Sequence, residues 1–273
     1  MNAVERWGGA LSGWGIPEEI LARAPESPWI YPTELFRRRA EAALITEPTP
    51  SVLRAAESLP RGGTVLDVGV GAGAASLPLA RRASRITGVD ASEDMLEAFR
   101  QAATDASVEA AAVLGRWPDV AGDVGPADVV VCGHVLYNVQ DLALFARALD
   151  GHARDRVVLE ITATHPLAWM SDLWLRFHGL ERPTRPTVDD AEKALRELGF
   201  DVHTEEVTRP PRTGGFPARE DAVSLVRRRL CLPPDRDQEI ASALGDRLVE
   251  HDGLWSAGPT DQAVVTLWWD TAR

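Results

Sequence analysis

Residues 64–83 of the chain read Thr-Val-Leu-Asp-Val-Gly-Val-Gly-Ala-Gly-Ala-Ala-Ser-Leu-Pro-Leu-Ala-Arg-Arg-Ala. The apolar run from Val65 to Val68 has the length and composition of a buried β-strand. Glycines at positions 69, 71 and 73 interrupt it, and apolar residues resume at helical spacing from Leu77. A strand, a glycine turn and a helix form a cradle for a nucleotide-like ligand, because glycines allow close backbone approach and the helix N-terminus offers unpaired N–H donors.

A second strand is predicted at residues 85–90, which read Arg-Ile-Thr-Gly-Val-Asp. Its last residue, Asp90, follows Gly71 by 19 positions (90 − 71). An acid at that distance lies at the tip of the neighbouring strand, where it can accept hydrogen bonds from both hydroxyls of a ribose. Glycines alone are a weak signal, but glycines, helix and spaced acid together indicate a nucleotide-type site.

Composition and charge narrow the class of protein. The chain has 273 residues, of which 45% are hydrophobic and 26% charged, as in a globular protein with ample core-forming material. Its net charge of −12 argues against a nucleic-acid or anionic-membrane partner, because phosphate binding needs an excess of Lys and Arg. The one tight basic run, Arg227 to Arg229, is expected on the solvated face of a helix.

Cysteine usage and the lack of targeting segments indicate a soluble, cytoplasmic protein. Cys132 and Cys231 are too few for a disulfide framework. The first 20 residues lack a charged-then-apolar leader, and no apolar run approaches membrane-spanning length. We therefore expect no membrane partner, and nothing in the sequence indicates an oligomeric state.

Residues 1–60 hold helical patterns and prolines rather than strands. Helices are expected after Pro17, after Pro32 and from Pro50, where Thr49 reads as an N-cap. The aromatic, proline-rich stretch at 24–32 has two interpretations. It is either a surface strap that buries its own Trp29 and Tyr31, or a lid over a ligand.

From residue 62 to 161 strands and helices alternate, which predicts a parallel sheet with helices on both faces. Asp141 is expected to cap a helix, and Thr187 with Asp190 resembles a capping box. After the two strands already placed, the expected strands lie at residues 108–114, 128–132, 156–161, 201–207 and 263–269.

The last strand is separated from the one before it by two helical patterns at residues 211–255. If that strand runs antiparallel to its predecessor, the connection emerges at the carboxyl edge of the sheet, where ligands bind in open α/β folds. The insert is then placed to enclose a substrate. We expect a helical segment at 1–60, a core formed by 61–210 and 256–273, and the insert at 211–255.

At this point the chain resembles the class I S-adenosylmethionine-dependent methyltransferases. Residues 65–73, Val-Leu-Asp-Val-Gly-Val-Gly-Ala-Gly, are similar to the acid-x-Gly-x-Gly-x-Gly first motif of that family. Residues 88–95 resemble its second motif, and residues 128–137 resemble its fourth. The resemblance covers about residues 50–210 and the final strand. It implies a three-layer, Rossmann-like α/β fold whose seven-stranded sheet is parallel except for an antiparallel last strand inserted beside the sixth.

The resemblance also implies roles for individual residues toward S-adenosylmethionine. Asp67 would help hold its amino group, Asp90 would take the ribose hydroxyls, and Met95 would pack near the adenine. The second motif places Ala91 in the same cofactor-binding set. The glycines expected against the methionine portion are Gly69, Gly71 and Gly73.

One departure from the family pattern follows the third strand. Many relatives carry an acid there that accepts from the adenine amino group, whereas residues 115–118 of this chain read Gly-Arg-Trp-Pro. Arg116 has only donors, so a backbone carbonyl would have to replace that contact. Trp117 can stack on the purine or be an ordinary buried tryptophan.

Two alternatives compete with a methyltransferase. Gly69-x-Gly71-x-x-Ala74 also satisfies the dinucleotide fingerprint, and Asp90 would serve NAD equally well, which would make the chain an NAD(P)-dependent oxidoreductase. The long helical segment before the first strand, Asp67 ahead of the glycines, and the late terminal strand argue against it. A protein that binds S-adenosylmethionine without catalysis is the third class.

Methyl transfer from a sulfonium is an in-line displacement, for which orientation supplies most of the rate and only a protonated nucleophile needs a base. His134 and His165 follow the fourth and fifth strands and are the candidate bases, although a histidine at a strand end is often structural. His134 also lies where relatives bind the methionine end of the cofactor. Tyr137 can orient an acceptor oxygen or belong to the core, and Glu160 can face the pocket or be salt-bridged.

No Cys and His residues have metal-ligand spacing, so no metal is expected. The sequence therefore predicts an enzyme that transfers a methyl group from S-adenosylmethionine to oxygen or nitrogen of a small-molecule acceptor. The acidic charge and the helical additions favour such an acceptor over nucleic acid.

Overall fold

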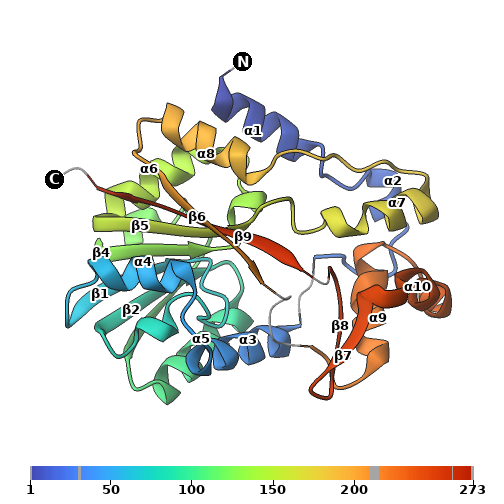
Figure 1. Cartoon of the computed structure of the whole chain (residues 1–273), viewed down its shortest axis with the longest axis horizontal. Helices are drawn as coiled ribbons and strands as arrows, with labels where there is room; N and C mark the ends of the chain where they lie inside the picture. Colours follow the sequence, from blue (N-terminus) through green and yellow to red (C-terminus); the bar gives the residue numbers. More distant parts are fainter. Residues whose placement is uncertain (1, 30–31, 210–214, 260, 272–273) are drawn as a thin grey trace.

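A seven-stranded sheet forms the centre of the chain (Figure 1). The structure, a computed structural model, describes residues 2–29, 32–209, 215–259 and 261–271. In spatial order the strands are β3 (Glu109–Leu114), β2 (Ala83–Asp90), β1 (Gly63–Val68), β4 (Ala127–Gly133), β5 (Ala153–Thr162), β9 (Gln262–Asp270) and β6 (His203–Arg209).

Strand β9 is antiparallel to both of its neighbours, while the other pairs in the sheet are parallel. Leu267 pairs with Leu159 of β5 on one side and with Thr204 of β6 on the other. The expected fold class is therefore confirmed, including the last strand beside the sixth. Because Val264 pairs with Thr162 at the end of β5, the connection into β9 leaves from the carboxyl edge of the sheet, as expected.

Helices cover the sheet on both faces, and each face has its own apolar cluster (Figure 1). Trp7, Phe145 and Leu195 are buried on one face, whereas Val52 and Phe99 are buried on the other. The first face carries α1 (Ala3–Ser12), α6 (Leu142–His152) and α8 (Val188–Glu197), and the second carries α3 (Thr33–Ile45), α4 (Pro50–Ser58) and α5 (Glu93–Asp105).

The predicted helix starts are confirmed at three caps. The hydroxyl of Thr49 accepts from the amide of Val52, and the carboxylate of Asp141 accepts from the amide of Leu144. Thr187 and Asp190 form the expected capping box at α8. These short-range bonds satisfy amides that have no partner inside the helix.

A third apolar cluster joins the insert to two segments from elsewhere in the chain. It packs Ile20 and Trp174 against Val226 and Ile240. Its elements gather beside the sheet in Figure 1 and are α2 (Glu18–Leu21), α7 (Ser171–His178), α9 (Arg219–Arg229), α10 (Asp237–Leu244) and the hairpin β7 (Leu248–His251) and β8 (Leu254–Ala257). The sequence predicted the two helices of the insert but not the hairpin.

The basic run on α9 does not lie on a solvated face, so that expectation was wrong. Arg227 is 5% exposed and Arg229 is 6% exposed. Arg227 reaches Glu26, at 2.8 Å, and Asp237, at 2.9 Å. Paired acids therefore allow an arginine to be buried between the 24–29 stretch and the insert.

The described part of the stretch at 24–32 departs from the strap interpretation at Trp29. The side chain of Trp29 is 53% exposed, so it does not bury itself as a strap residue would. Tyr31 lies outside the described residues. Glu26 fastens the stretch to α9 through Arg227.

The helix expected after the glycine turn is reduced to a single 3-10 turn, η1 (Leu77–Leu79). Strand β2 begins at Ala83, so only a few residues remain after the turn, and Pro78 has no amide to donate. The remaining 3-10 turns are η2 (Ala121–Asp123), η3 (Leu136–Asn138), η4 (Ala168–Met170), η5 (Pro234–Arg236) and η6 (Gly245–Arg247).

Within the described part of the chain, no helix has both the length and the apolar character needed to cross a bilayer.

Candidate active site

The turn after β1 requires glycine at three positions. Gly69, Gly71 and Gly73 have φ values of +74°, +52° and +93°, in the region that side chains disfavour. A Cβ on Gly69 would lie 2.3 Å from Cγ2 of Val135, and a Cβ on Gly73 would lie 2.6 Å from Leu77. The turn is therefore a close-packed bend beside the loop after β4.

Asp90 anchors this turn from the tip of β2. Its Oδ2 accepts from the amide of Gly71 at 2.9 Å, and its Oδ1 accepts from the amide of Ser92 at 3.0 Å. Each carboxylate oxygen has a second lone pair, so Asp90 can also accept from hydroxyls of a ligand. The neighbouring Ala91 is exposed, and Met95 is buried in the first turn of α5.

Asp67 is completely buried in β1, below the turn. Burial raises the pKa of its carboxyl to about 7, with the charge of Asp90 adding to the shift and the Ser76 hydroxyl opposing it. Among the described residues, no donor makes a hydrogen bond of normal geometry to either carboxylate oxygen. A buried carboxylate short of donors fits a ligand ammonium group, such as the amino group of S-adenosylmethionine.

Arg116 and Trp117, which follow β3, have different surroundings. Arg116 is exposed, whereas Trp117 packs its ring edge-on against His152 of α6 with centroids 4.8 Å apart. The indole nitrogen of Trp117 is buried, and the ring joins the apolar cluster of the α1, α6 and α8 face. This packing favours the buried-tryptophan interpretation over stacking on a purine.

His134 lies where β4 meets the glycine turn. It has a φ of +61°, and the next residue, Val135, is the one that contacts Gly69. Its Nε2 lies 2.9 Å from Oε1 of Glu160, which is 5% exposed on the neighbouring strand β5. The hydroxyl of Ser51, on α4, donates to Oε2 of Glu160 at 2.6 Å. Glu160 therefore faces the site and joins it to the N-terminal segment.

His165 and Tyr137 lie in a packed aromatic group with Trp14, not in an open site. The His165 ring stacks on Trp14 with centroids 3.7 Å apart and contacts Tyr137 edge-on. Burial and the charge of Arg182 lower the pKa of His165 to about 3. An imidazole with so low a pKa is a poor general base at neutral pH. The packing and the low pKa therefore favour a structural role for His165 over that of a base.

Tyr137 is held in the same way. Its hydroxyl donates to the carbonyl of Thr162 at 2.9 Å, its ring stacks on Trp7, and 5% of the residue is exposed. Burial raises the pKa of the hydroxyl. Tyr137 thus belongs to the core, and the idea that it orients an acceptor loses its support.

Two residues at the site were not expected from the sequence. Phe36 of α3 lies over Gly71, where an added Cβ would be 3.3 Å from its ring. Ser51 reaches Glu160 from 109 residues away. The helical spacing of the N-terminal segment predicted helices there, but nothing in that pattern indicated which side chains meet the carboxyl edge of the sheet.

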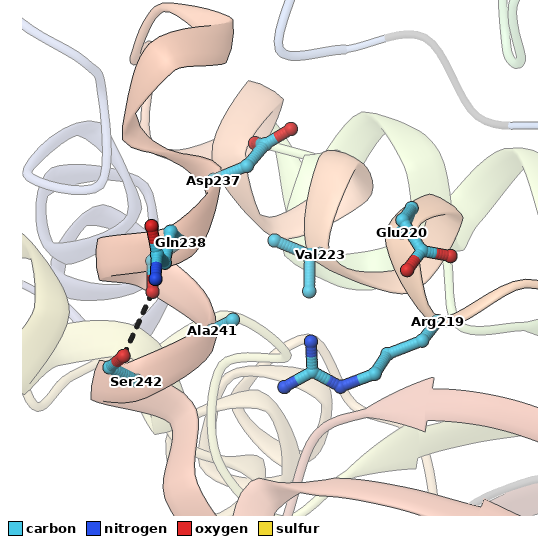
Figure 2. Close-up of a pocket in the computed structure, with 7 residues that line it drawn as sticks. All are labelled: Arg219, Glu220, Val223, Asp237, Gln238, Ala241 and Ser242. Atoms are coloured by element: carbon cyan, nitrogen blue, oxygen red, sulfur yellow. Dashed lines mark hydrogen bonds between the residues drawn. The ribbon is translucent and has the colours of Figure 1, made fainter.

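Two cavities lie on the side of the molecule that carries the insert. One, of about 310 Å³, separates α3 from the start of the insert and is lined by residues including Leu35, Arg38, Phe216 and Arg228. The other, of about 440 Å³, lies between α9 and α10, and Figure 2 shows the Arg219 guanidinium reaching into it. Its lining comes only from the insert, so it is separate from the glycine turn: Arg219, Glu220, Val223, Asp237, Gln238, Ala241 and Ser242.

Within the described ranges, no group of three or more His, Cys, Asp or Glu side chains is arranged to hold a metal ion.

Comparison with known proteins agrees with this geometry. The family model described as "Methyltransferase domain" matches residues 36–205. No curated protein matches the chain. Among solved structures, the YcgJ protein of Bacillus subtilis is 18% identical, with a TM-score of 0.53 over 82% of this chain and 99% of that one.

A cyclopropane-fatty-acyl-phospholipid synthase-like protein from Lactobacillus casei ATCC 334 is also similar, at 16% identity and a TM-score of 0.52 over 86% of this chain and 92% of that one. The BH2331 protein of Bacillus halodurans C-125 is 15% identical, with a TM-score of 0.52 over 81% and 99% of the two chains. At these identities the solved structures support the fold alone.

Proposed function

Because the chain belongs to the methyltransferase domain family and its cofactor is S-adenosylmethionine, we propose that it methylates oxygen or nitrogen of a small-molecule acceptor. The observation that carries the proposal is the cradle itself, a glycine turn tied to Asp90 above the buried Asp67 carboxylate. When bound, the cofactor supplies an electrophilic methyl group on a sulfonium. The residues of the chain bind it, orient it and handle a proton.

The roles follow from the charges and contacts at the cradle. Asp67 offers a buried carboxylate for an ammonium group, and the remaining lone pairs of Asp90 suit the ribose hydroxyls. The positive-φ glycines let the ligand approach the backbone, and Phe36 covers the turn from α3. Met95, buried in the first turn of α5, supplies an apolar surface for the adenine.

His134 is the candidate base. It is the histidine that lies beside the turn, and its imidazole is 24% exposed, so an acceptor can reach it. A proton that leaves an acceptor hydroxyl or amine can move to this ring, and the Glu160 carboxylate balances the charge that results. Removal of the acceptor proton by His134 does not itself require a metal ion.

The geometry weakens the dinucleotide alternative. A pyrophosphate binds at the N-terminus of a helix, whereas η1 is only three residues long. A protein that binds the cofactor without transfer needs no base, so the histidine–carboxylate pair beside the turn favours transfer. Both alternatives remain outcomes of the test below.

A small acceptor is supported by a partly open cavity and by the charge of the chain. The segments 1–60 and 211–255 contribute residues from 32–38 and 215–228 to the lining of a partly open cavity of about 310 Å³, a size suited to a small molecule. The net charge of −12 opposes a polyanionic acceptor. We infer that these two segments enclose the acceptor, with the core of 61–210 and 256–273 holding the cofactor.

The test is a calorimetric titration with S-adenosylmethionine, S-adenosylhomocysteine, NAD and NADP in parallel. Micromolar binding of the first two alone supports the proposal and leads to a screen of hydroxyl and amine acceptors with labelled methyl donor. Binding of NAD or NADP instead would overturn it. Binding of S-adenosylmethionine with no transfer to any acceptor class, including RNA and peptide controls, would favour the non-catalytic protein.

A further inference from the structure

Glu160 and His134 are joined by two separate contacts, one of the backbone and one of the side chains. They lie on adjacent parallel strands, where Gly133 of β4 pairs with Glu160 of β5. The amide of His134 donates to the carbonyl of Glu160 at 2.6 Å, and its Nε2 meets the Glu160 carboxylate at 2.9 Å. His134 is thus bonded to Glu160 through both its backbone amide and its imidazole.

The backbone of His134 is held in an unfavourable conformation. Its φ of +61° is in the left-handed region, where a residue other than glycine costs about 1–2 kcal/mol. Such strain persists only where the surrounding contacts hold the residue in place, and it concentrates at functional sites. At this position it presents the ring to the Glu160 carboxylate.

The second carboxylate oxygen is held from α4. Ser51 donates its hydroxyl hydrogen to Oε2 of Glu160 at 2.6 Å. A hydroxyl has a single hydrogen, so the 2.7 Å contact between the Ser51 and Thr49 hydroxyls must use the hydrogen of Thr49. Thr49 in turn accepts from the amide of Val52 as the N-cap of α4. The hydrogen of Thr49 therefore points to Ser51, and the hydrogen of Ser51 points to Glu160.

We propose that Glu160 is a positioning residue that fixes His134 as the Nε2–H tautomer, with the lone pair on Nδ1, and that Ser51 holds Glu160 in place. A carboxylate that accepts from one ring nitrogen decides which nitrogen keeps its lone pair. The inference rests on the proposed function only for the use of that lone pair. In methyl transfer, the acceptor proton moves to Nδ1, and the imidazolium is stabilised by Glu160.

The arrangement also gives the N-terminal segment a part in the chemistry. Ser51 is carried by α4, two residues after the Thr49 cap, and its partner is 109 residues away in the sequence. Docking of α4 on the sheet is therefore what completes the chain of hydrogen bonds to His134.

The test uses Glu160→Gln, which keeps the shape of the side chain but offers an amide. Because the Ser51 hydroxyl donates to one carboxylate oxygen, it retains the oxygen of the new amide, whose nitrogen then faces Nε2 of His134 and donates to it, so the hydrogen of the imidazole moves to Nδ1. Protein labelled with ¹⁵N-histidine reports the tautomer through the nitrogen chemical shifts, with the His134 signals identified from their loss in His134→Gln. We expect the Nε2–H form in the native protein and Nδ1–H in Glu160→Gln. Retention of Nε2–H in that variant would overturn the proposal.

Two more variants separate positioning from folding. Glu160→Asp should keep the native tautomer, because a carboxylate remains, and Ser51→Ala should broaden the His134 signals as Glu160 loses its second donor. Glu205→Gln is the matched control, since Glu205 is a strand glutamate that pairs with Arg54 of the same helix α4 but does not reach His134. The His134 shifts should not move in Glu205→Gln, and a shift equal to that of Glu160→Gln would contradict the assignment.

S-adenosylhomocysteine titrations separate this inference from the proposed function. We expect the native protein to bind S-adenosylhomocysteine, as the proposed function requires. If the native protein fails to bind it, the proposed function fails, but the tautomer still decides the role of Glu160. If binding is retained and the tautomer does not respond, only the inference fails.

Discussion

The imidazole of His165 lies flat against the indole of Trp14, with ring centroids 3.7 Å and ring planes 9° apart. This contact joins Trp14, just after α1, to the loop after β5. It explains why the histidine that looked like a base from its place after a strand is a packed, neutral group.

The first prediction concerns acid stability. Between its ordinary pKa of 6.5 and the folded value of about 3, His165 takes up a proton only when the chain unfolds, so stability falls as pH drops through this window. His165→Phe keeps a flat ring on Trp14 but cannot titrate. Urea unfolding at pH 7 and pH 4.5 should show a smaller loss of stability in the variant than in the native protein.

His251→Gln is the control for that experiment, because the side chain of His251 is 85% exposed. Its stability should follow that of the native protein at both pH values. His165→Phe also removes the acceptor for the amide of Leu167, so a general loss of about 1 kcal/mol is expected at every pH. An unchanged pH dependence in His165→Phe would disprove the buried, neutral state.

The second prediction is a pH-dependent cofactor affinity set by Asp67. With a pKa of about 7, its carboxyl is mostly protonated at pH 6 and mostly ionised at pH 8. A ligand ammonium prefers the ionised form, so S-adenosylhomocysteine should bind about tenfold more weakly at pH 6 than at pH 8. Calorimetry on Asp67→Asn should show weaker binding at pH 8 and a flatter pH dependence.

The same carboxyl affects the ligand-free protein in the opposite direction. Because its pKa is raised from 3.8 on folding, stability falls as pH rises from about 4 to about 7. Asp67→Asn should remove this loss. Asp94→Asn, exposed in the first turn of α5, is the control and should leave both pH dependences as they are in the native protein.

The third prediction separates the two tasks of Asp90. Asp90→Ala loses both the anchor of Gly71 and the acceptor for ribose, and S-adenosylmethionine affinity should fall by at least about tenfold, equivalent to 1.4 kcal/mol. Asp90→Asn can still accept from Gly71, so its thermal stability should remain closer to native while its affinity falls. Native affinity in Asp90→Ala would remove the residue from the site.

The fourth prediction tests the close packing of the turn. Gly69 and Gly62 have nearly equal φ values, +74° and +75°, but only Gly69 has a neighbour, Val135, at 2.3 Å from an added Cβ. Gly62→Ala should therefore cost only the backbone penalty, about 1–2 kcal/mol. Gly69→Ala should cost more in urea unfolding and should also weaken cofactor binding.

A double variant identifies the clash. Val135→Ala removes the methyl group that an alanine at 69 would meet, so Gly69→Ala with Val135→Ala should be more stable than the sum of the two single changes predicts. Strict additivity would show that the backbone angle, not Val135, makes glycine necessary.

Local signals in the sequence predicted much of this fold. The Thr49 and Asp141 caps and the Thr187 capping box depend on residues three positions away, and all three form. The strands read from apolar runs also lie where expected, because such runs have little alternative to burial. The helix predicted after the glycines does not form, because apolar periodicity does not show that β2 begins only a few residues later.

The candidate site was less predictable because its contacts are long-range. Asp90 and Gly71 could be paired from a known spacing, but the burial of Arg227 depends on Glu26, about two hundred residues before it in the chain. His134 and Glu160 meet only through the register of β4 and β5. His134 is preferred to His165 as the candidate base because His165 packs against Trp14, a contact that no local sequence pattern predicts.

The position of β9 has a consequence for the order in which the sheet can form. Residues 262–270 are synthesised more than fifty positions after β6, yet they lie between β5 and β6 and pair with both. On the ribosome, β6 must therefore wait for β9 before it can join the sheet. The connection that has to fold back in the meantime is the insert, so folding of the insert and closure of the sheet become a single late event.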